Sequence, residues 1–334
     1  MSTRLPPDVL IITRRDIAQV MAPGDYLKAV EQAFRAAAMG EASSPQPMHL
    51  PVIRGGFHAK GASLSLDRDY VAVKINGNFP GNPRELGLPT IQGAIFLADG
   101  NNGVLLAILD SIEVTLRRTA AASALAARLL ARPDSDTLLV CGCGEQGRAH
   151  VTALRQVLPL QHCVLWDRDH ELAEALVAEL ADASGIHAAA VRDLEAASIS
   201  ADVIATCTTA REPFLDVELV KAGTFIAAVG ADSPDKSEIA PRLMAAATVI
   251  TDLLHQCAAM GDLRHAIAAA LMTEDDVHAD LGQLLVGAKA GRRSPEEIVI
   301  FDSTGTGLQD VAASAAIYER CMSGSAQSIA LAAL

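Results

Sequence analysis

Apolar residues in the first forty positions recur at the spacing of helices. The runs 14–21 and 26–40 each place apolar side chains on one face, and Thr13 with Asp16 forms a capping-box pattern that opens the first run. The segment 43–52 that follows contains three prolines and cannot continue a helix. The chain is therefore predicted to begin with two helices and then a loop or an edge strand.

The period changes to that of strands between residues 57 and 110. Three β-branched residues within 71–75 alternate with shorter or polar ones, and this pattern places Lys74 on the opposite face of the strand. The apolar runs 92–98 and 104–110 flank a turn of Asp, Gly and Asn, which predicts a hairpin. The first third of the chain is thus predicted to be an α+β unit built on antiparallel pairing.

Short apolar runs separated by helices make up most of the rest. An alanine-rich helix over 115–131 must end before Pro133. Six nearly continuous apolar runs follow, which is typical of parallel strands covered on both faces. We therefore predict the α/β class, with a doubly wound parallel sheet over about 135–302 and one more helix that ends near residue 321. The six runs are 137–141, 162–166, 202–206, 224–229, 248–251 and 297–301.

Length and charge narrow the class of protein. The 334 residues suggest about two domains, and 27 Lys+Arg against 40 Asp+Glu give a formal net charge of −13. So acidic a chain lacks the positive surface that nucleic acids require, and no nucleic-acid partner is expected. The first residues encode neither a signal peptide nor a spanning helix, so we expect no membrane partner and a cytoplasmic location.

The cysteine pattern agrees with that location. None of the six cysteines forms a CxxC pair, and the closest two, Cys141 and Cys143, are separated by one residue. Structural zinc sites usually take ligands in CxxC-like pairs. The sequence therefore predicts reduced, mostly buried thiols and no metal site.

The strongest chemical signal is the string CGCGEQGRAH. It places Gly142, Gly144 and Gly147 in a GxGxxG pattern directly after an apolar strand, with a helix expected to begin near Glu145 or Gln146. The first glycine permits a tight turn, the second lets the backbone approach a pyrophosphate, and the third allows the helix to pack closely on the strand. The helix N-terminus offers free N–H groups to phosphates. The segment is predicted to bind a dinucleotide; the alternative is a glycine turn without a ligand.

Asp167 and Arg168 bear on the choice of dinucleotide. Asp167 ends the next strand and follows Gly147 by 20 residues, the expected distance to a carboxylate that accepts the ribose hydroxyls. A carboxylate there repels a 2′-phosphate, which favours NAD. Arg168 could instead bind that phosphate, so NADP is the alternative.

The strings around this motif resemble the ornithine cyclodeaminase/μ-crystallin family, which includes archaeal-type alanine dehydrogenases and ketimine reductases. The matching strings run in family order over about residues 70–310. The resemblance implies an NAD(P)-binding Rossmann domain over 119–307 and a discontinuous domain, 1–118 with 308–334, that binds substrate and forms a homodimer. The strings are VAVKINGNFPG, GLPTIQGAIFLAD, TLRRTAAASALAARLLAR, CGCGEQGRAH, AAVGADSPDKSEI and FDSTGTGLQD.

The family pattern implies catalytic or substrate-binding roles for Lys74, Arg118 and Asp232. Arg118 is expected in the first turn of a buried helix, where its charge opposes the helix dipole unless an anion such as a substrate carboxylate binds; an internal salt bridge is the alternative. Lys74 is expected to hold the carboxylate or to act as acid and base, the alternative being a snorkelling lysine. Asp232 follows a parallel strand and is expected to transfer the proton of a substrate amine or water, or else to cap a helix.

Other positions of the same strings are expected to border the ligands. Thr206, Cys207 and Thr208 end a strand and are expected to lie beside the nicotinamide, unless they merely terminate the strand. Ser303 and Asp310 belong to a segment that resembles the family's closing loop, whose polar groups reach the cofactor or substrate.

One position departs from the family pattern. Family members commonly carry an additional arginine in the proline-bearing segment before the first β unit, and here that segment offers only His49. We expect His49 to replace the arginine as a carboxylate donor, or Lys74 and Arg118 to bind the carboxylate alone. The departure leaves the identity of the substrate open.

Three functions are compatible with these residues. The preferred one is an NAD(P)-dependent amino-acid dehydrogenase or imine reductase, which transfers hydride between nicotinamide and the α-carbon of a small α-amino or α-imino acid. The second is an ornithine cyclodeaminase, which borrows and returns the hydride to form proline and ammonia, with Asp232 holding the distal amine. The third is a non-catalytic, crystallin-like ligand-binding protein, and the presence of Lys74, Arg118 and Asp232 argues against it.

Overall fold

The computed structural model describes residues 8–181, 185–322 and 326–330. The chain divides into two compact units. Unit 1 comprises Met1–Arg118 and Thr306–Leu334, and unit 2 comprises Thr119–Gly305.

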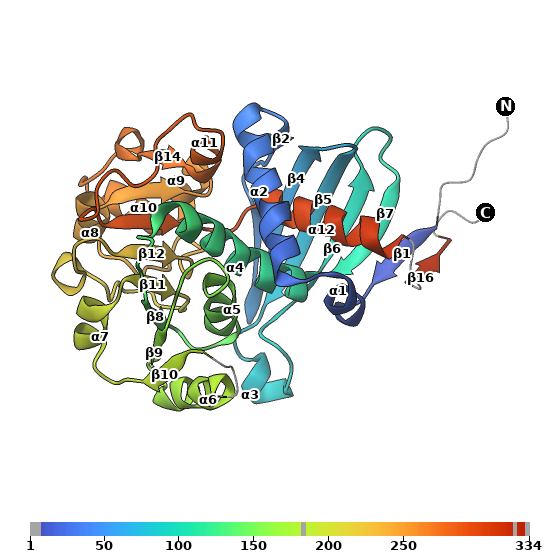
Figure 1. The fold of residues 1–334 in the computed structure, drawn as a ribbon. Helices are drawn as coiled ribbons and strands as arrows, with labels where there is room; N and C mark the ends of the chain where they lie inside the picture. The colour runs from blue at the N-terminus through green and yellow to red at the C-terminus, as the bar shows by residue number, and fades with distance from the viewer. Residues whose placement is uncertain (1–7, 182–184, 323–325, 331–334) are drawn as a thin grey trace. The chain divides into compact units, whose positions relative to one another are not determined.

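Unit 1 is built on one mixed sheet, with strand order β16-β1-β7-β6-β5-β4-β2 and with β3 paired to β4 (Figure 1). All of these pairs are antiparallel except β1 with β7. Its strands are β1 (Val9–Ile12), β2 (Ala42–Ser43), β3 (Met48–Val52), β4 (Gly55–Ser65), β5 (Asp69–Asn78), β6 (Ile91–Asp99), β7 (Leu105–Asp110) and β16 (Gln327–Ile329). Its helices are α1 (Arg14–Val20), α2 (Pro23–Met39), α3 (Asn82–Leu86) and α12 (Gly307–Cys321).

Helix α12 covers one face of this sheet, and α2 packs beside it (Figure 1). Directly opposed residues of antiparallel strands share a face. Lys74 on β5 is opposed by Lys60 on β4 and by Ile95 on β6, so these three side chains lie on one face. Lys74 and Ile95 are buried there. The alternation of side chains along β5 thus places Lys74 on the face of the sheet that α12 covers.

The other face of the sheet is apolar and exposed. Phe57, Val73, Ile75 and Phe96 are 38%, 39%, 41% and 37% exposed. Phe57 belongs to β4, Val73 and Ile75 to β5, and Phe96 to β6. We refer to these four residues as the apolar sheet face. Exposed apolar side chains that cluster in this way mark interaction surfaces more often than scattered ones do.

Both predicted N-terminal helices are present, although α2 begins at Pro23, three residues before its predicted start, because proline is tolerated in the first turn of a helix. The Thr13 hydroxyl accepts a hydrogen bond from the N–H of Asp16, whose carboxylate accepts one from the N–H of Thr13 at 2.9 Å, which completes the capping box. The proline-rich segment provides the edge strand β3. Strand β1 precedes the two helices and was not predicted, because a four-residue run is too short to reveal a period.

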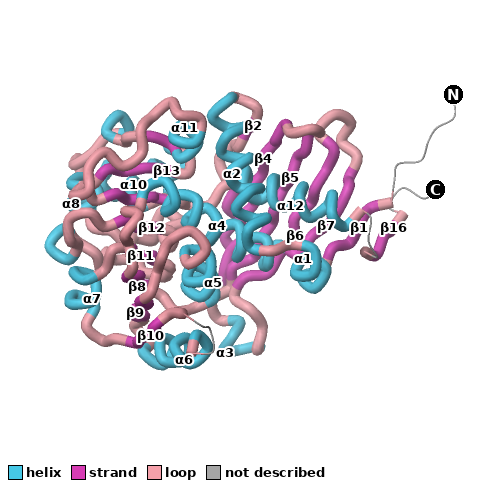
Figure 2. The backbone as a smooth tube through the Cα atoms, viewed as in Figure 1, coloured by secondary structure: helices cyan, strands magenta, loops and turns pink. Residues whose placement is uncertain are grey.

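Unit 2 contains a sheet that is parallel throughout, with order β10-β9-β8-β11-β12-β15-β13-β14. Figure 2 labels β10, β9, β8, β11, β12 and β13 of this sheet, which it draws in magenta. Its strands are β8 (Thr137–Cys141), β9 (His162–Trp166), β10 (His187–Ala190), β11 (Val203–Thr206), β12 (Phe225–Ala228), β13 (Thr248–Thr251), β14 (Ala279–Asp280) and β15 (Val299–Asp302). The helices between them are α5 (Glu145–Leu154), α6 (His170–Leu180), α7 (Leu194–Ser200), α8 (Pro241–Ala246), α9 (Leu254–Met260), α10 (Asp262–Ala268) and α11 (Leu281–Leu285), with 3₁₀ turns η1 (Val217–Leu219) and η2 (Glu274–Asp276).

This order confirms the predicted doubly wound, Rossmann-type sheet. The chain runs outward from β8 through β9 to β10 and then returns to β11 on the other side of β8. The carboxyl ends of β8 and β11 therefore flank the point where the strand order reverses, which is where open α/β sheets bind ligands. All six predicted strands are present. Strand β10 was missed because its sequence, HAAA, has little strand preference, and β14 because it has only two residues.

Helix α4 (Ser111–Leu130) begins four residues earlier than expected. Asp110 ends β7, and its carboxylate accepts a hydrogen bond from the N–H of Glu113 at 2.9 Å, which caps the helix. Arg118 consequently lies about two turns inside the helix. The expectation that its charge opposes the helix dipole is wrong, because that effect is confined to the first turn.

Two observations concern the chemical environment of the chain. All six cysteines are free thiols, and five of them are buried, as expected. In the part of the chain that the structure describes, no helix combines the length and apolar character needed to cross a bilayer.

Candidate active site

The turn between β8 and α5 has the geometry that its glycines predict. Gly142 has a φ of +98°, and a Cβ atom there would lie 2.8 Å from the carbonyl oxygen of Cys207. A Cβ atom on Gly147 would overlap the carbonyl oxygen of Gly142. Gly144 is exposed, and a Cβ atom there would have open space around it. The turn therefore requires glycine at two positions and leaves an open approach at the third.

Helix α5 begins directly after Gly144, so its first N–H groups face this turn without helical partners. The side-chain oxygen of Gln146 is buried and has no hydrogen-bond partner among the described residues. Glu145 is exposed and forms an ion pair with Arg148 at 2.8 Å. Free N–H groups and an unpaired buried polar atom beside a glycine cradle fit a bound dinucleotide.

Asp167 lies at the end of β9, next to the same turn. One carboxylate oxygen accepts a hydrogen bond from the N–H of Cys143 at 2.8 Å, and the other accepts one from the N–H of Asp169 at 2.9 Å. A carboxylate oxygen can accept a second hydrogen bond, so Asp167 retains capacity for ribose hydroxyls. Arg168 is exposed. Asp167 thus also holds the turn itself, a role that its spacing alone did not predict.

The end of β11 is organised by a residue that the sequence analysis did not single out. Glu238 is fully buried, and its carboxylate accepts hydrogen bonds from the hydroxyl groups of Thr206 and Thr208, at 2.6 and 2.7 Å. Cys207 lies between them, with its sulfur 3.6 Å from Nδ1 of His150. Glu238 stands in the string AAVGADSPDKSEI directly after Asp235, Lys236 and Ser237, so no local pattern signalled its burial.

Further buried acids lie at the neighbouring strand ends. Ser303 donates a hydrogen bond to Asp252 at 2.9 Å, and the N–H of Gly305 donates to the same carboxylate at 2.8 Å. Asp302 accepts a hydrogen bond from the N–H of Leu263 at 3.0 Å. Burial raises the pKa of Asp302 well above its usual value. Ser303 is therefore hydrogen-bonded to one of the buried acids at the carboxyl ends of the unit 2 strands.

Asp232 lies in the loop after β12, at the same edge of the sheet. It is exposed and forms an ion pair with Lys236 at 2.6 Å. No helix follows it directly, so the alternative role of a helix N-cap is wrong.

Unit 1 brings Lys74, Arg118 and Asp310 together in one buried cluster. Nζ of Lys74 lies 2.7 Å from Asp310, and Nε of Arg118 lies 2.9 Å from the other oxygen of the same carboxylate. The three side chains are 4%, 3% and 1% exposed. Strand β5, helix α4 and the first turn of α12 supply one residue each. The internal salt bridge considered as an alternative for Arg118 is therefore present.

Burial changes the protonation of this cluster. Desolvation lowers the pKa of Lys74 to about 7, against the opposing attraction of Asp310. Burial also works against ionisation of Asp310, yet Arg118 and Lys74 together hold its pKa below the usual value. With both bases protonated, the cluster has two positive charges and one negative charge. The excess positive charge is a binding element for an anion.

Buried polar atoms without partners among the described residues lie on α12 and at its N-cap residue. Arg118 donates to the side-chain oxygen of Gln309 at 2.5 Å, which leaves the Gln309 amide nitrogen buried and without a partner among the described residues. The hydroxyl of Thr306 is likewise buried and has no hydrogen-bond partner among the described residues. Buried polar groups are normally paired, so these two atoms are candidates for contact with a ligand.

His49 is not brought into this cluster. It lies on the exposed edge strand β3, and its ring contacts that of His58, with 3.3 Å between the two Nδ1 atoms. It shares the α12 side of the sheet with Lys74 but lies two strands away, because His49 pairs with His58 and His58 with Asn76.

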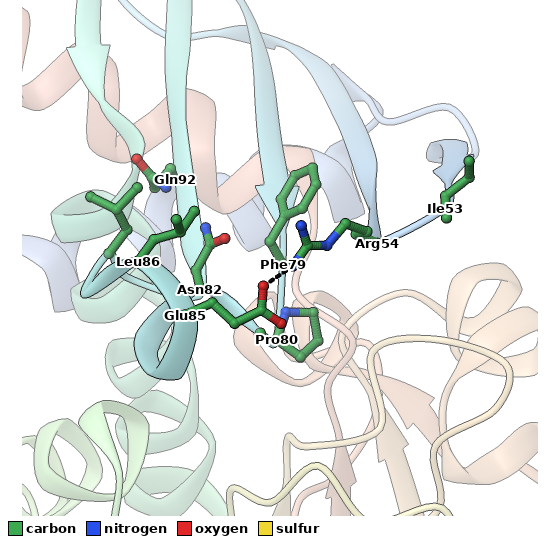
Figure 3. Close-up of a pocket in the computed structure, with 10 residues that line it drawn as sticks. Ile53, Arg54, Phe79, Pro80, Asn82, Glu85, Leu86 and Gln92 are labelled. Atoms are coloured by element: carbon green, nitrogen blue, oxygen red, sulfur yellow. Dashed lines mark ion pairs between the residues drawn. The ribbon is translucent and has the colours of Figure 1, made fainter.

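A cavity of about 610 Å³ opens elsewhere in unit 1, around the loop that contains α3 (Figure 3). Phe79, Asn82 and Gln92 line it, and Arg54 forms an ion pair with Glu85 at its wall. None of the residues predicted to bind substrate or cofactor lines this cavity.

Comparison with known proteins agrees with this geometry. A model of the ornithine cyclodeaminase/mu-crystallin family matches residues 8–325. Alanine dehydrogenase of Archaeoglobus fulgidus is 36% identical over 316 residues, which cover 95% of this chain and 96% of that protein.

Two solved structures share the fold over nearly the whole chain. An archaeal alanine dehydrogenase dimer with bound NAD matches with a TM-score of 0.92 and 35% identity, covering 97% of this chain and 99% of that one. The Δ1-pyrroline-2-carboxylate reductase of Thermococcus litoralis, in complex with NADH and L-proline, matches with a TM-score of 0.90 and 27% identity over 94% and 98% of the two chains. Together with the strand order and the glycine turn, these matches show that the chain belongs to the ornithine cyclodeaminase/mu-crystallin family.

Proposed function

We propose that this protein is an NAD-dependent oxidoreductase that acts on the α-carbon of a small α-amino or α-imino acid. The observation that carries the proposal is the glycine turn of unit 2, which is built for a dinucleotide in a chain that aligns almost end to end with an NAD-bound alanine dehydrogenase. The small amino or imino acid is its partner in the reaction.

The proposed dinucleotide site uses residues at the carboxyl edge of the sheet. The N–H groups at the start of α5, with Gly144 open to approach, would hold the pyrophosphate. Asp167 would accept the ribose hydroxyls, and its charge favours NAD over NADP. When bound, NAD accepts or delivers a hydride. Thr206–Thr208 and Ser303 are proposed to lie near its reactive end.

Unit 1 is proposed to bind the substrate through its carboxylate. Arg118 presents a planar guanidinium group suited to a carboxylate, and Lys74 adds a second positive charge. Asp310 would keep both cations in place before substrate binds, since it contacts each of them. His49 remains a proposed additional donor, because its ring is exposed and on the same side of the sheet.

Reduction of an imine requires a proton as well as a hydride, and two residues are proposed to supply it. Lys74, whose pKa is lowered to about 7 by burial, can exchange a proton near neutral pH. Asp232 is exposed and can pass a proton from solvent when its ion pair with Lys236 opens, which does not require a substrate ammonium to replace Lys236. The imino acid gains a hydride at the α-carbon and a proton at nitrogen, and oxidation of the amino acid reverses both transfers.

The alternative is the cyclodeaminase reaction, which gives the family its name. It requires an acid that holds the distal amine of ornithine, and Asp232 is the candidate. Its carboxylate is already paired with Lys236 at 2.6 Å. The ion pair satisfies the charge that a substrate ammonium would have to satisfy, so we favour net dehydrogenation or imine reduction.

We further propose that two copies of the chain associate through the apolar sheet face. These four residues are exposed in the single chain, and the archaeal alanine dehydrogenase that matches this fold is described as a dimer. Burying this face against a second copy would remove its apolar side chains from water. The free thiols support a reducing, cytoplasmic location.

The substrate assignment can be tested with Arg118→Met. In one assay the protein is mixed with NADH and either pyruvate plus ammonia or pyrroline-2-carboxylate, and nicotinamide absorbance is followed. In a second assay it is mixed with ornithine and catalytic NAD, and proline formation is followed. We expect net NADH oxidation with an imino acid, and a loss of kcat/KM on the order of 100-fold in Arg118→Met, with NADH affinity retained. Arg117→Met is the matched control, because Arg117 pairs with Glu113 on the same helix. Proline formed without net NADH oxidation would favour the cyclodeaminase instead.

Asp232→Asn tests the proton-transfer role. General acid–base catalysis contributes about 100-fold or more, so turnover should fall by at least that factor while NADH titration is unchanged. Asp235→Asn, which changes another exposed carboxylate of the same loop, is the control. Full turnover by Asp232→Asn would remove this residue from the mechanism and leave Lys74 as the proton donor.

The buried state of Lys74 predicts a pH-dependent stability. Its pKa is about 7 in the folded protein against 10.5 ordinarily, so between these values the unfolded state binds more protons. The free energy of unfolding then rises with pH, by at most about 1.4 kcal/mol per pH unit. We expect urea unfolding to show the unmodified protein gaining stability relative to Lys74→Met from about pH 7 to pH 10. Exposed Lys28→Met should show no such trend, and a constant difference for Lys74→Met would contradict the prediction.

The proposed dimer is tested by Ile75→Glu. A carboxylate at the centre of the apolar sheet face would have to be buried without a partner, so we expect a monomer in sedimentation velocity at concentrations where the unmodified protein is a dimer. Circular dichroism checks that the fold is kept. Leu172→Glu, at an exposed leucine of α6, is the control and should leave assembly unchanged. A dimer that survives Ile75→Glu would place the interface elsewhere.

A further inference from the structure

Glu238 is a buried carboxylate at the carboxyl edge of unit 2 that accepts four hydrogen bonds. It is 0% exposed and lies in the segment between β12 and α8. One of its oxygens accepts hydrogen bonds from the N–H and the hydroxyl of Thr208, at 2.6 and 2.7 Å. The other accepts from the hydroxyl of Thr206 at 2.6 Å and from the N–H of Gly230 at 2.8 Å. One carboxylate thus joins the ends of β11 and β12.

The backbone around Glu238 is adapted to this carboxylate. A Cβ atom on Gly230 would overlap the Glu238 carboxylate, so only glycine allows this approach. The N–H of Glu238 donates a hydrogen bond to the carboxylate of Asp262 on α10 at 2.8 Å, which fixes the backbone of this segment. The side chain therefore joins segment 206–208 to the loop that carries Glu238 itself, and Asp262 anchors that loop.

A short series of contacts leads from Glu238 to the glycine turn. Cys207 lies between the two threonines that donate to Glu238. The N–H of Cys207 donates to the carbonyl of Cys141 at 2.7 Å, and its own carbonyl packs against Gly142, where a Cβ atom would lie 2.8 Å away. Segment 206–208 therefore lies directly beside the turn that is proposed to hold the dinucleotide.

We propose that Glu238 is a positioning residue for the dinucleotide site, which it serves by fixing segment 206–208 and Gly230 beside the glycine turn. This inference rests on the proposed function, because it assumes that the turn binds NAD. Glu238 touches neither cofactor nor substrate in this role. It supplies the acceptors that the loop N–H groups lack once the strands have ended.

Burial raises the pKa of Glu238 to about 7, and the hydrogen bonds from Thr206 and Thr208 oppose this rise because they stabilise the carboxylate. The pattern of these hydrogen bonds fits a carboxylate better than an amide. Each oxygen of Glu238 accepts one backbone N–H, from Thr208 on one side and from Gly230 on the other. In Glu238→Gln the amide NH₂ would face a backbone N–H in either orientation, so one donor is always left opposite another donor. The isosteric change therefore disturbs a loop without changing the volume of the side chain.

The test compares two ligands that share one part of the site. ADP-ribose contains the pyrophosphate and both riboses that the glycine turn and Asp167 would hold, whereas NADH adds the nicotinamide proposed to lie near segment 206–208. We expect Glu238→Gln to raise the Kd of NADH by about 10-fold or more, which is 1.4 kcal/mol, and to change the Kd of ADP-ribose much less. Both are measured by isothermal titration calorimetry on the full chain. A role in folding alone would lower the unfolding temperature and leave the ratio of the two Kd values unchanged.

Matched variants keep the outcome decisive. Thr208→Val removes one hydroxyl donor and keeps the N–H, so it should shift the ratio in the same direction by a smaller factor. Glu218→Gln, at an exposed glutamate of η1 paired with Arg242, should leave both ligands unaffected. If Glu238→Gln does not fold, the inference is tested with Thr208→Val alone. A higher ratio of the NADH Kd to the ADP-ribose Kd in this variant supports the inference, and an unchanged ratio overturns it. Failure of the unmodified protein to bind NADH would instead overturn the proposed function.

Discussion

A single buried carboxylate, Asp310, holds two buried cations in unit 1. Lys74 comes from β5, Arg118 from α4 and Asp310 from α12, so one ion cluster joins three elements of the fold. Taking such charges out of water costs several kcal/mol per ion, and their attraction offsets this only while every partner is in place. When Lys74 is protonated, the cluster has one positive charge in excess, so the residues that join these elements also form a binding site for an anion. Stability and proposed substrate binding therefore have the same physical origin.

Unit 2 uses buried acids in a different way. Its strands end at one edge, and the loops that leave them carry N–H groups with no sheet partner. Glu238 accepts two of these N–H groups, and Asp252 accepts that of Gly305. The loops proposed to surround the nicotinamide are thus held by buried carboxylates. Helical dipoles and glycine backbone then remain available at the turn itself, where a dinucleotide would bind.

Much of the fold could be predicted from the sequence, because the signals were local. The six apolar runs became strands of a parallel sheet, and the spacing of Gly142, Gly144 and Gly147 produced the expected turn before α5. Sequence patterns were less informative at element ends. Helix α4 began earlier than its alanine-rich stretch indicated, because Asp110 caps it through the N–H of Glu113. Because the helix starts earlier, Arg118 lies outside the first turn and the helix dipole does not explain its role. Its partner is instead Asp310, which lies far along the chain.

The sequence by itself determined the periodicity of the elements, the glycine turn and the acidic residue at the end of β9, since each depends on neighbours within a few positions or on a fixed spacing. Only the tertiary structure decided which face of β5 is covered and which acid meets which base. Alternation placed Lys74 opposite the branched residues, but packing of α12 buried the lysine and left Val73 and Ile75 exposed. Asp310 and Glu238 acquire their roles from contacts across 192 and 30 residues of chain, and local patterns carry no information about such distances.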